Sequence, residues 1–311
     1  MAFSHSTRFA IIARVTPPSA RVAIVIVNYE TYAELRDCLA SLEEEAHAGR
    51  EIVVVDHVSR ESAADELVRG FPHIHLLRVP ANEGFAAGVN RGARASRGAY
   101  LLLLNPDSII DAGLVGRLAD WMDAHPDVGA VGPRILNDDG TVQASARRFP
   151  DFTAVVAGRS SWLTKALPRN PLSRRNLPAL TADPSKPMAV DWVSGACMMI
   201  RRSAFEQIAG MDEGFFLYWE DADFCRRLGH AGWRVMYLPT VATQHIGGRS
   251  SMHAADASLV AFHRSAYRLF RKHAAGASRL LSPLVFLALQ VRLAFVRRLV
   301  RARQRAAAVR G

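Results

Sequence analysis

The chain has 311 residues, of which 50% are hydrophobic and 22% charged. This length allows one or two domains with a large core, and the composition excludes disorder over most of the chain. The net charge of +10 comes from the C-terminal end: residues 257–311 carry 12 Lys and Arg and no acid, whereas residues 1–256 carry 27 basic and 29 acidic residues. Basic charge confined to one end argues against nucleic-acid binding, so no nucleic-acid partner is expected.

The cysteine pattern and the N-terminus indicate the cellular compartment in which the protein works. The three cysteines are far apart and form no CxxC pair, so neither a disulfide framework nor a zinc knuckle is predicted: Cys38, Cys197 and Cys225. The apolar piece at residues 9–13 is too short for a secretory signal. We expect no export, a reducing compartment and an N-terminal extension over residues 1–21.

Strand-like and helix-like runs alternate through the first hundred residues. Apolar runs at 22–27, 52–55, 74–79 and 100–104 alternate with helical patterns at 32–46, 61–69 and 85–96. Such alternation predicts a parallel sheet with covering helices. Polar residues follow the strands at Asn28, Asp56 and 105–107, where ligands bind in open α/β sheets.

Further along, a helix over 112–124 and an apolar run over 128–136 precede a turn at 137–140. Residues 150–190 contain six prolines between basic residues, which predicts a flexible loop within one domain. We therefore expect a single catalytic domain over residues 22–256, interrupted by this loop.

The tail at residues 257–311 is predicted to be a basic helical segment. Its uncharged stretch at 280–291 is shorter than the roughly 20 residues of a membrane span. A helical wheel separates two groups, Gln290, Arg297, Arg298, Arg301 and Arg305 from Leu284, Leu289, Phe295 and Leu299. This favours a helix lying on an anionic membrane surface. The alternative is a terminal helix packed on the core.

Two separate positions could form a metal site. Asp107 follows the strand-like Leu101–Leu104 and a proline, and one such carboxylate with phosphate oxygens and waters suffices for Mg²⁺. The alternative for residues 105–107, taken by themselves, is an ordinary turn. His245 follows another strand-like run and, if it faced Asp107, would complete a mixed oxygen and nitrogen site for Mg²⁺ or Mn²⁺. The alternative for His245 is a structural histidine.

Gly84, Gly88 and Gly92 recur at four-residue intervals, which predicts close approach along one side of a helix. The approaching group is either a neighbouring strand or helix, or a nucleotide near the helix N-terminus. The pattern is neither a dinucleotide-binding GxGxxG nor a phosphate-binding loop.

An aromatic run at 215–219 precedes three acids, Glu220, Asp221 and Asp223, which are predicted to open a helix. Acids in a first turn are ordinarily partners of the helix dipole. The apolar surroundings suggest a second interpretation, in which partial desolvation raises the pKa of a carboxylate to that of a useful base.

Taken together and in this order, the motifs of residues 22–250 resemble inverting family 2 glycosyltransferases of the GT-A fold, in particular the rhamnosyltransferase-like branch. The resemblance rests on a strand ending in Asn-Tyr, the segment Asn82-Glu-Gly-Phe-Ala-Ala-Gly-Val-Asn90, Leu-Asn-Pro-Asp107, Gly-Ala then Arg-Arg, an aromatic-Glu-Asp segment and a late histidine. It implies an α/β fold of GT-A type, a nucleotide-binding Rossmann-like sandwich with a mostly parallel sheet, plus the basic C-terminal helical tail.

The resemblance also assigns roles to individual residues. Asp221 corresponds to the catalytic base, with Glu220 beside it, and Asp107 and His245 to ligands of Mg²⁺ or Mn²⁺. Asn105 replaces the first acid of the family's DxD motif. The nucleotide sugar would contact Asn28, Tyr29, Glu30, Asp56, Asn82, Gly84, Asn90 and Asn105. The acceptor side would include Gly195, Ala196, Arg201, Arg202 and Trp219.

We therefore expect a metal-dependent inverting transferase that moves L-rhamnose from dTDP-L-rhamnose to a lipid-linked saccharide during cell-surface polysaccharide synthesis. It would work in the cytoplasm, on the inner face of the plasma membrane. The alternatives are transfer from another UDP- or dTDP-sugar, a non-catalytic membrane-associated scaffold that binds nucleotide sugars, and nucleotidyl transfer, for which the glycine-rich loop with arginine and lysine is missing.

Overall fold

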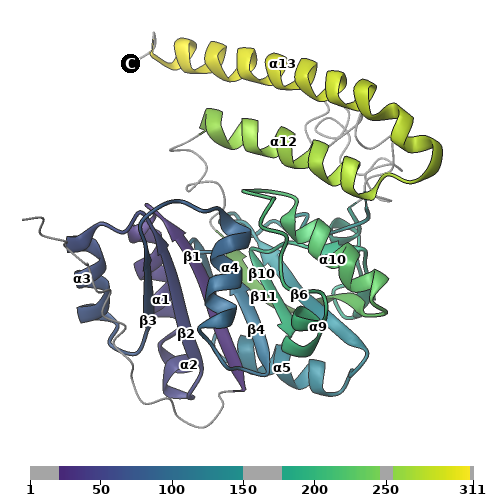
Figure 1. The fold of residues 1–311 in the computed structure, drawn as a ribbon. Coiled ribbons are helices and arrows are strands. Elements are labelled where there is room, and N and C mark those ends of the chain that lie inside the picture. Colours follow the sequence, from purple (N-terminus) through teal and green to yellow (C-terminus); the bar gives the residue numbers. More distant parts are fainter. Residues whose placement is uncertain (1–20, 150–176, 246–254, 309–311) are drawn as a thin grey trace, which may run out of the picture.

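A computed structural model describes residues 21–149, 177–245 and 255–308 and shows a mixed α/β domain with two C-terminal helices (Figure 1). Residues 1–20 of the predicted N-terminal extension and residues 150–176 of the predicted loop lie outside these ranges. Nine strands of the described residues form one sheet in the order β3-β2-β1-β4-β10-β6-β11-β5, with β8 paired to β11. A further two-stranded sheet joins β7 to β9.

The first half of the sheet is parallel, as predicted. Its strands are β1 (Val22–Tyr29), β2 (Glu51–His57), β3 (His75–Val79) and β4 (Tyr100–Leu104). The intervening helices are α1 (Tyr32–Ser41), α2 (Glu43–His47), α3 (Glu61–Gly70) and α4 (Phe85–Arg94). Parallel pairing of β1 with β2 and β4 brings their carboxyl ends to one edge of the sheet.

The second half contains both strand directions. Its strands are β5 (Ser108–Ile110), β6 (Val128–Leu136), β7 (Ala146–Arg147), β8 (Met188–Ala189), β9 (Trp192–Val193), β10 (Cys197–Arg201) and β11 (Arg234–His245). The helical segments are α5 (Leu114–Asp123), η1 (Pro178–Leu180), α9 (Arg202–Gln207) and α10 (Glu220–His230). Strand β10 runs antiparallel between β4 and β6 and joins the two halves. Because η1 and β8 lie within 177–190, the predicted loop does not extend through those residues.

The core forms one layer on each face of the sheet. Alternate residues of β1 belong to opposite layers: Ile24 and Ile26 pack with α1 and α5, whereas Val25 and Val27 pack with α4 and α10. Helix α4 approaches β1 closely, because a Cβ on Gly88 would lie 2.7 Å from a methyl group of Val27. Packing against a strand therefore accounts for Gly88, which was one of the two predicted reasons. The three cysteines are buried and unpaired.

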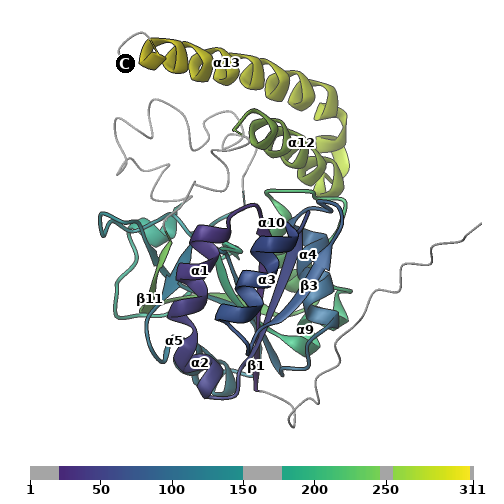
Figure 2. The same ribbon diagram turned by 90° about the vertical axis from the view of Figure 1, so that its left-hand side faces the viewer.

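The tail forms a helical hairpin beside the domain: α12 (Ala255–His273), η2 (Gly276–Leu281) and α13 (Ser282–Ala308). Helix α12 lies between the domain and α13 (Figures 1 and 2). Leu289 is buried on the side of α13 that faces α12, whereas Leu284, Phe295 and Leu299 are exposed, so the apolar group of the wheel is divided between two sides of the helix. Gly276–Ala302 is long and apolar enough to cross a membrane, by length and composition only.

Candidate active site

The carboxyl ends of β1 and β2 carry a buried hydrogen-bond network centred on Asp56. Asn28 Nδ2 donates to Asp56 Oδ1 over 2.6 Å, and Tyr32 and Ser59 donate to Oδ2 over 2.9 and 2.6 Å. Asn28 in turn accepts a hydrogen bond from Thr31. Two of the predicted nucleotide-binding side chains, Asn28 and Asp56, are therefore fixed before any ligand arrives.

Tyr29 and Glu30 lie at the exposed rim of the same edge. Glu30 has a left-handed backbone (φ 57°), and its carboxylate pairs with Arg60 at 2.9 Å. Asn82 Oδ1 accepts a hydrogen bond from Gly84 N, which orders the turn that leads into α4. Burial lowers the pKa of the neighbouring His57 imidazole. Tyr29, Glu30 and Asn82 thus border the network around Asp56.

The structure brings Asp107 and His245 together. His245 Nε2 lies 3.0 Å from Asp107 Oδ1 and 3.3 Å from Asn105 Nδ2, although the residues are about 140 positions apart. The antiparallel pair β5–β11 places Ser108 opposite His245 and so brings the end of β11 to the turn after β4. Asp107 is 3% exposed.

Gln143, which the sequence analysis did not identify, orients His245. Gln143 Nε2 donates to the His245 carbonyl over 2.9 Å, so its Oε1, 3.1 Å from Nδ1, is an acceptor and Nδ1 carries the ring proton. Nε2 then directs its lone pair toward Asp107. Two ligands about 2.1 Å from one cation, at right angles to each other, lie about 3.0 Å apart, so the pair fits Mg²⁺ or Mn²⁺.

In the described part of the chain, no group of three or more His, Cys, Asp or Glu side chains could hold a metal ion. Asp107 and His245 form a pair of candidate ligands instead, with Asn105 beside them. Mg²⁺ commonly binds one or two carboxylates together with phosphate oxygens and waters. The site therefore fits a cation that a diphosphate helps to hold.

The predicted catalytic acids open α10 after an unusual turn. Tyr218 and Trp219 have φ values of 68° and 69°, a left-handed conformation that costs energy in residues other than glycine. Asp221 accepts hydrogen bonds from Ala222 N at 2.8 Å and Gly195 N at 3.2 Å. Burial raises the pKa of Asp221, which favours its use as a base.

Glu220 is more deeply buried than Asp221, at 6% exposure, and its Oε2 atom finds no hydrogen-bond partner among the described residues. Burial, followed by the charge of Asp221, raises the pKa of Glu220 well above its ordinary value. Because Asp221 remains partly exposed, it is the carboxylate that an acceptor hydroxyl can reach.

Gly195 and Ala196 connect the Asp107–His245 pair to the candidate base, Asp221. Gly195 N donates to Asp221, and the carbonyl of Ala196 accepts hydrogen bonds from Asn105 N over 3.0 Å and from Ser108 Oγ. The predicted base and the turn that holds Asp107 thus contact neighbouring residues of one short segment. Asp107, His245 and Asp221 therefore lie in one region of the domain.

Arg147 and Trp192, which the sequence analysis did not identify, join Trp219 near Asp221. Arg147 lies over the Trp192 ring, 4.7 Å from its centroid, and its positive charge lowers the pKa of Asp221. The Trp192 and Trp219 rings are 6.1 Å apart. The base is therefore bordered by two tryptophans and an arginine, which suit the apolar face and the hydroxyl groups of a sugar.

Two other predicted residues, Asn90 and Gly84, have structural partners. Asn90 donates to Met211 O and to Glu213 and accepts from Met211 N, so its amide ties α4 to the segment before α10. Gly84 (φ +90°) faces backbone, because a Cβ there would lie 2.9 Å from Phe216 Cα. Neither residue needs a nucleotide to explain it.

Arg201 and Arg202 lie away from the Asp107–His245 pair. Arg201 is opposite Tyr100, at the start of β4, whereas Cys197 is opposite Leu104, at its end. The Arg201 guanidinium donates to the carbonyls of residues 122, 125 and 128, and that of Arg202 to those of residues 93 and 98. The structure therefore does not place these arginines with the acceptor-side residues Gly195, Ala196 and Trp219, because β10 separates them.

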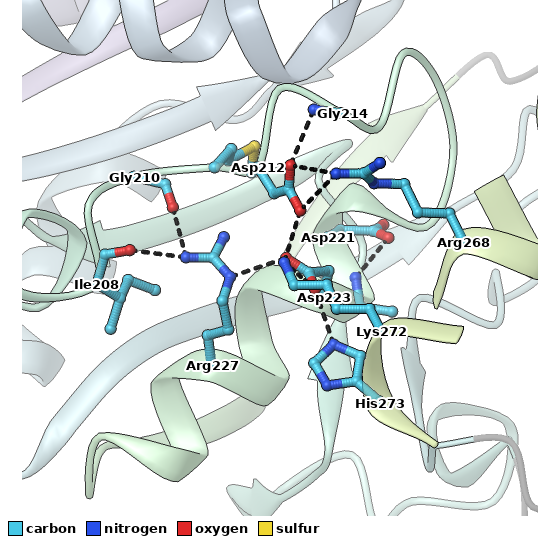
Figure 3. Close-up of polar contacts among 12 residues, drawn as sticks. Ile208, Gly210, Asp212, Gly214, Asp221, Asp223, Arg227, Arg268, Lys272 and His273 are labelled. Atoms are coloured by element: carbon cyan, nitrogen blue, oxygen red, sulfur yellow. Dashed lines mark hydrogen bonds and ion pairs between the residues drawn. The ribbon is translucent and has the colours of Figure 1, made fainter. Parts of the chain in front are cut away.

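The remaining acid of α10, Asp223, binds α12 (Figure 3). It is fully buried and pairs with Arg227 of its own helix and with Lys272 and His273 of α12, each at 2.8 Å. Asp212 pairs with Lys272 at 2.6 Å and with Arg268 at 3.0 Å. The helix that carries the candidate base is thus fixed to the C-terminal hairpin.

Comparison with known proteins identifies the family of the chain. Residues 23–209 match the model of glycosyl transferase family 2, and residues 180–253 match that of the N-terminal domain of galactosyltransferase. The N-acetylglucosaminyl-diphospho-decaprenol L-rhamnosyltransferase of Mycobacterium tuberculosis is 32% identical over 255 residues, which cover 78% of this chain and 82% of that protein. A low-salt glycan biosynthesis hexosyltransferase of Haloferax volcanii is 32% identical over 66% of this chain and 61% of its own length.

Among solved structures, a mannosyltransferase of Pyrobaculum calidifontis in complex with GDP-Man and Mn²⁺ is similar in fold, with a TM-score of 0.54 and 18% identity over 97% of this chain and 84% of that one. GalNAc-T7 with UDP, GalNAc and Mn²⁺ matches 72% of this chain and 42% of that chain, with a TM-score of 0.53 and 16% identity. These likenesses support the expected GT-A type of fold. The chain belongs to glycosyltransferase family 2 and is a rhamnosyltransferase-like glycosyltransferase.

Proposed function

We propose that this glycosyltransferase moves L-rhamnose from dTDP-L-rhamnose to a lipid-linked saccharide, with inversion at the anomeric carbon. The observation that carries the proposal is the placement of the Asp107–His245 pair and of Asp221 on either side of the Gly195–Ala196 segment. The printed name of the Mycobacterium tuberculosis relative supports both rhamnose and a lipid-linked acceptor.

In this proposal Asn28 and Asp56 form the floor of the nucleotide site, with Tyr29, Glu30 and Asn82 at its rim. The network from Tyr32 and Ser59 holds Asp56 in one orientation, which lowers the entropy cost of nucleotide binding. Asn105 and Asp107 follow β4 and lie toward the diphosphate. The Mn²⁺ in two structures of similar fold supports a divalent cation here.

The reaction is a single displacement. A divalent cation at Asp107 and His245 supplies positive charge that stabilises the diphosphate leaving group. Asp221 removes the proton of the acceptor hydroxyl as that oxygen attacks the anomeric carbon from the face opposite the diphosphate. A positioned base of this kind contributes roughly 10²- to 10⁴-fold to the rate. Burial and the charge of Asp221 favour the protonated form of Glu220, which leaves Asp221 as the base.

A lipid-linked acceptor places the enzyme at a membrane, and we propose that it acts on the cytoplasmic face with the basic tail at an anionic leaflet. Exposed arginines Arg298 and Arg301 support this, since each basic residue near such a surface contributes about 1 kcal/mol.

The test is an assay of the purified enzyme with a panel of dTDP-, UDP- and GDP-sugars, Mg²⁺ or Mn²⁺, and polyprenyl-diphosphate saccharides. Transfer from dTDP-L-rhamnose is expected. Transfer from another donor would assign a different sugar, and nucleotide-sugar binding without transfer from any donor would favour the scaffold.

The base is tested separately. Asp221→Asn should lower kcat by at least about 10²-fold while nucleotide-sugar binding, measured by calorimetry, stays at the wild-type level. Asp37→Asn is the matched control, because Asp37 is an exposed acid on α1 outside the site. Full turnover in Asp221→Asn would remove Asp221 as the base.

A further inference from the structure

The outer face of α13 is an apolar stripe that no described residue covers. Leu284, Leu287, Val291 and Phe295 are 60–63% exposed. Their spacing of three or four residues places them on one side of the helix. Val285, Leu289 and Leu293, on the opposite side, are at most 7% exposed. Helix α13 therefore has two apolar faces, one packed on α12 and one in contact with solvent.

An exposed apolar stripe on a long helix is typical of a surface with a partner. Charge identifies the partner in this case. Arg298 and Arg301 are exposed near the C-terminal end of the stripe, and the exposed Gln290 lies on its flank. An apolar stripe bordered by arginines suits a lipid leaflet, because the acyl chains are apolar and the headgroups are anionic.

Contacts between the two helices oppose a spanning arrangement. Arg292 hydrogen-bonds His263 Nε2 over 3.0 Å and lies over the Phe262 ring, and Arg297 pairs with Asp256. Crossing the bilayer would break these contacts and move the freed arginines into hydrocarbon, which costs several kcal/mol. The helix therefore lies along the leaflet rather than across it.

Helix α12 connects this stripe to residues 212–223, which include the candidate base Asp221 and are called the catalytic loop below. The ring centroid of Phe262 lies 5.8 Å from that of Tyr218 and 5.3 Å from that of Trp219. Ser265 Oγ donates a hydrogen bond to Leu217 O over 2.9 Å. The pairs of Asp212 and Asp223 with α12 fix the same segment at its two ends (Figure 3). The left-handed turn before Asp221 is thus held by the hairpin.

The hairpin also lies at the edge of the sheet that carries the candidate site. Strand β11 ends at His245 beside Asp107, and α12 contacts residues 212–223 next to Asp221. Figures 1 and 2 show α12 and α13 above this edge of the sheet.

We propose that the α12–α13 hairpin docks the enzyme on a lipid leaflet by inserting Leu284, Leu287, Val291 and Phe295 among the acyl chains, and that α12 thereby holds the catalytic loop toward the membrane. The proposal rests on the proposed function only for the lipid-linked acceptor. Binding is mainly apolar, so it persists at high salt and on neutral lipid, and anionic lipid strengthens it.

The test is vesicle flotation of the full chain with two variants that add the same charge to neighbouring exposed positions. Val291→Glu places a carboxylate in the stripe, and Gln290→Glu places one on the flank, about 100° round the helix. With phosphatidylcholine vesicles at high salt, Val291→Glu should lower the partition coefficient about tenfold or more, and Gln290→Glu should leave it near the wild-type value. Because both sites are exposed, the two variants should melt like the wild type.

Three outcomes would overturn the proposal: equal loss in the two variants, binding that vanishes at high salt, or protein that resists extraction by alkaline carbonate, as a spanning helix does. A wild-type dimer that Val291→Glu dissociates, with flotation unchanged, would assign the stripe to a second copy of the chain instead. Flotation needs no donor or acceptor, so it stands even if the proposed reaction fails.

The link to catalysis has its own readout. Val291→Glu should lower the rate with an acceptor embedded in vesicles and retain the wild-type rate with a short-chain acceptor in solution. Equal loss with both acceptors would contradict docking as the role of the stripe.

Discussion

Replacing Gln143 by methionine tests how the structure orients His245, one of the two candidate metal ligands. The side chain binds His245 twice, through Nε2 to the carbonyl at 2.9 Å and through Oε1 to Nδ1 at 3.1 Å. Methionine has a similar length and makes neither hydrogen bond. Each such bond has a net value of about 0.5–1.5 kcal/mol, so the loss is about 1–3 kcal/mol, or roughly 5- to 150-fold in metal affinity. Residues that orient metal ligands commonly account for about 10- to 100-fold.

The assay is transferase activity as a function of Mn²⁺ concentration at saturating donor. Gln143→Met should raise the half-saturating Mn²⁺ concentration by about 10-fold or more while excess Mn²⁺ restores most of the rate. Gln244→Met is the matched control, because Gln244 is exposed and precedes His245 in the chain. The reasoning is refuted if the Mn²⁺ requirement of Gln143→Met is unchanged while His245→Ala abolishes activity.

Three further predictions follow from individual contacts. Gly84→Ala should lower the free energy of unfolding by about 2–4 kcal/mol in urea titrations, because φ is +90° and the new Cβ would press on Phe216; wild-type stability would contradict this. Arg147→Gln should move the acid limb of kcat to higher pH, because loss of its charge raises the pKa of the Asp221 base further; superimposable pH profiles would argue against it. Burial acts to raise the pKa of Asp212, but Lys272, Gly214 N and Arg268 lower it to about 2, so the ionised form stabilises the fold above pH 3.8 and this stability is lost as the pH falls toward 2. Asp212→Asn should therefore cost about 1–2 kcal/mol at neutral pH and less near pH 2, and a constant difference across that range would count against the ion pair.

The first half of the fold follows from the sequence because three of its strands, β1, β2 and β4, contain continuous apolar runs bounded by polar residues. Such runs are buried on both faces, as Val22–Val27 is, and helices of ordinary length separate them. The direction of β10 could not be predicted, because an apolar run such as Cys197–Ile200 reads the same in a parallel and an antiparallel strand. Its neighbours, β4 and β6, are also remote in sequence.

The candidate site was predictable where a side chain follows a strand or opens a helix. Asp107, His245 and Asp221 all occupy such positions, and the order of their motifs indicated the family. Gln143 and Arg147 were missed because they lie in a segment whose strand, β7, has only two residues and no periodicity. Arg201 was misplaced because proximity in sequence to Gly195 hides the length of β10, which carries the arginine to the opposite end of the sheet.

The position of β10 has a consequence for folding during synthesis. Both β4 and β6 emerge from the ribosome before residues 197–201. Until β10 arrives, β4 keeps one unpaired backbone edge and β6 keeps two, because its other neighbour, β11, follows β10 in the chain. Leu101–Leu104 is the most apolar of these edges and would pair readily with strands of other nascent chains. Completion of the sheet is therefore a late, non-local event, and the interval before it is when the growing polypeptide most needs protection by chaperones.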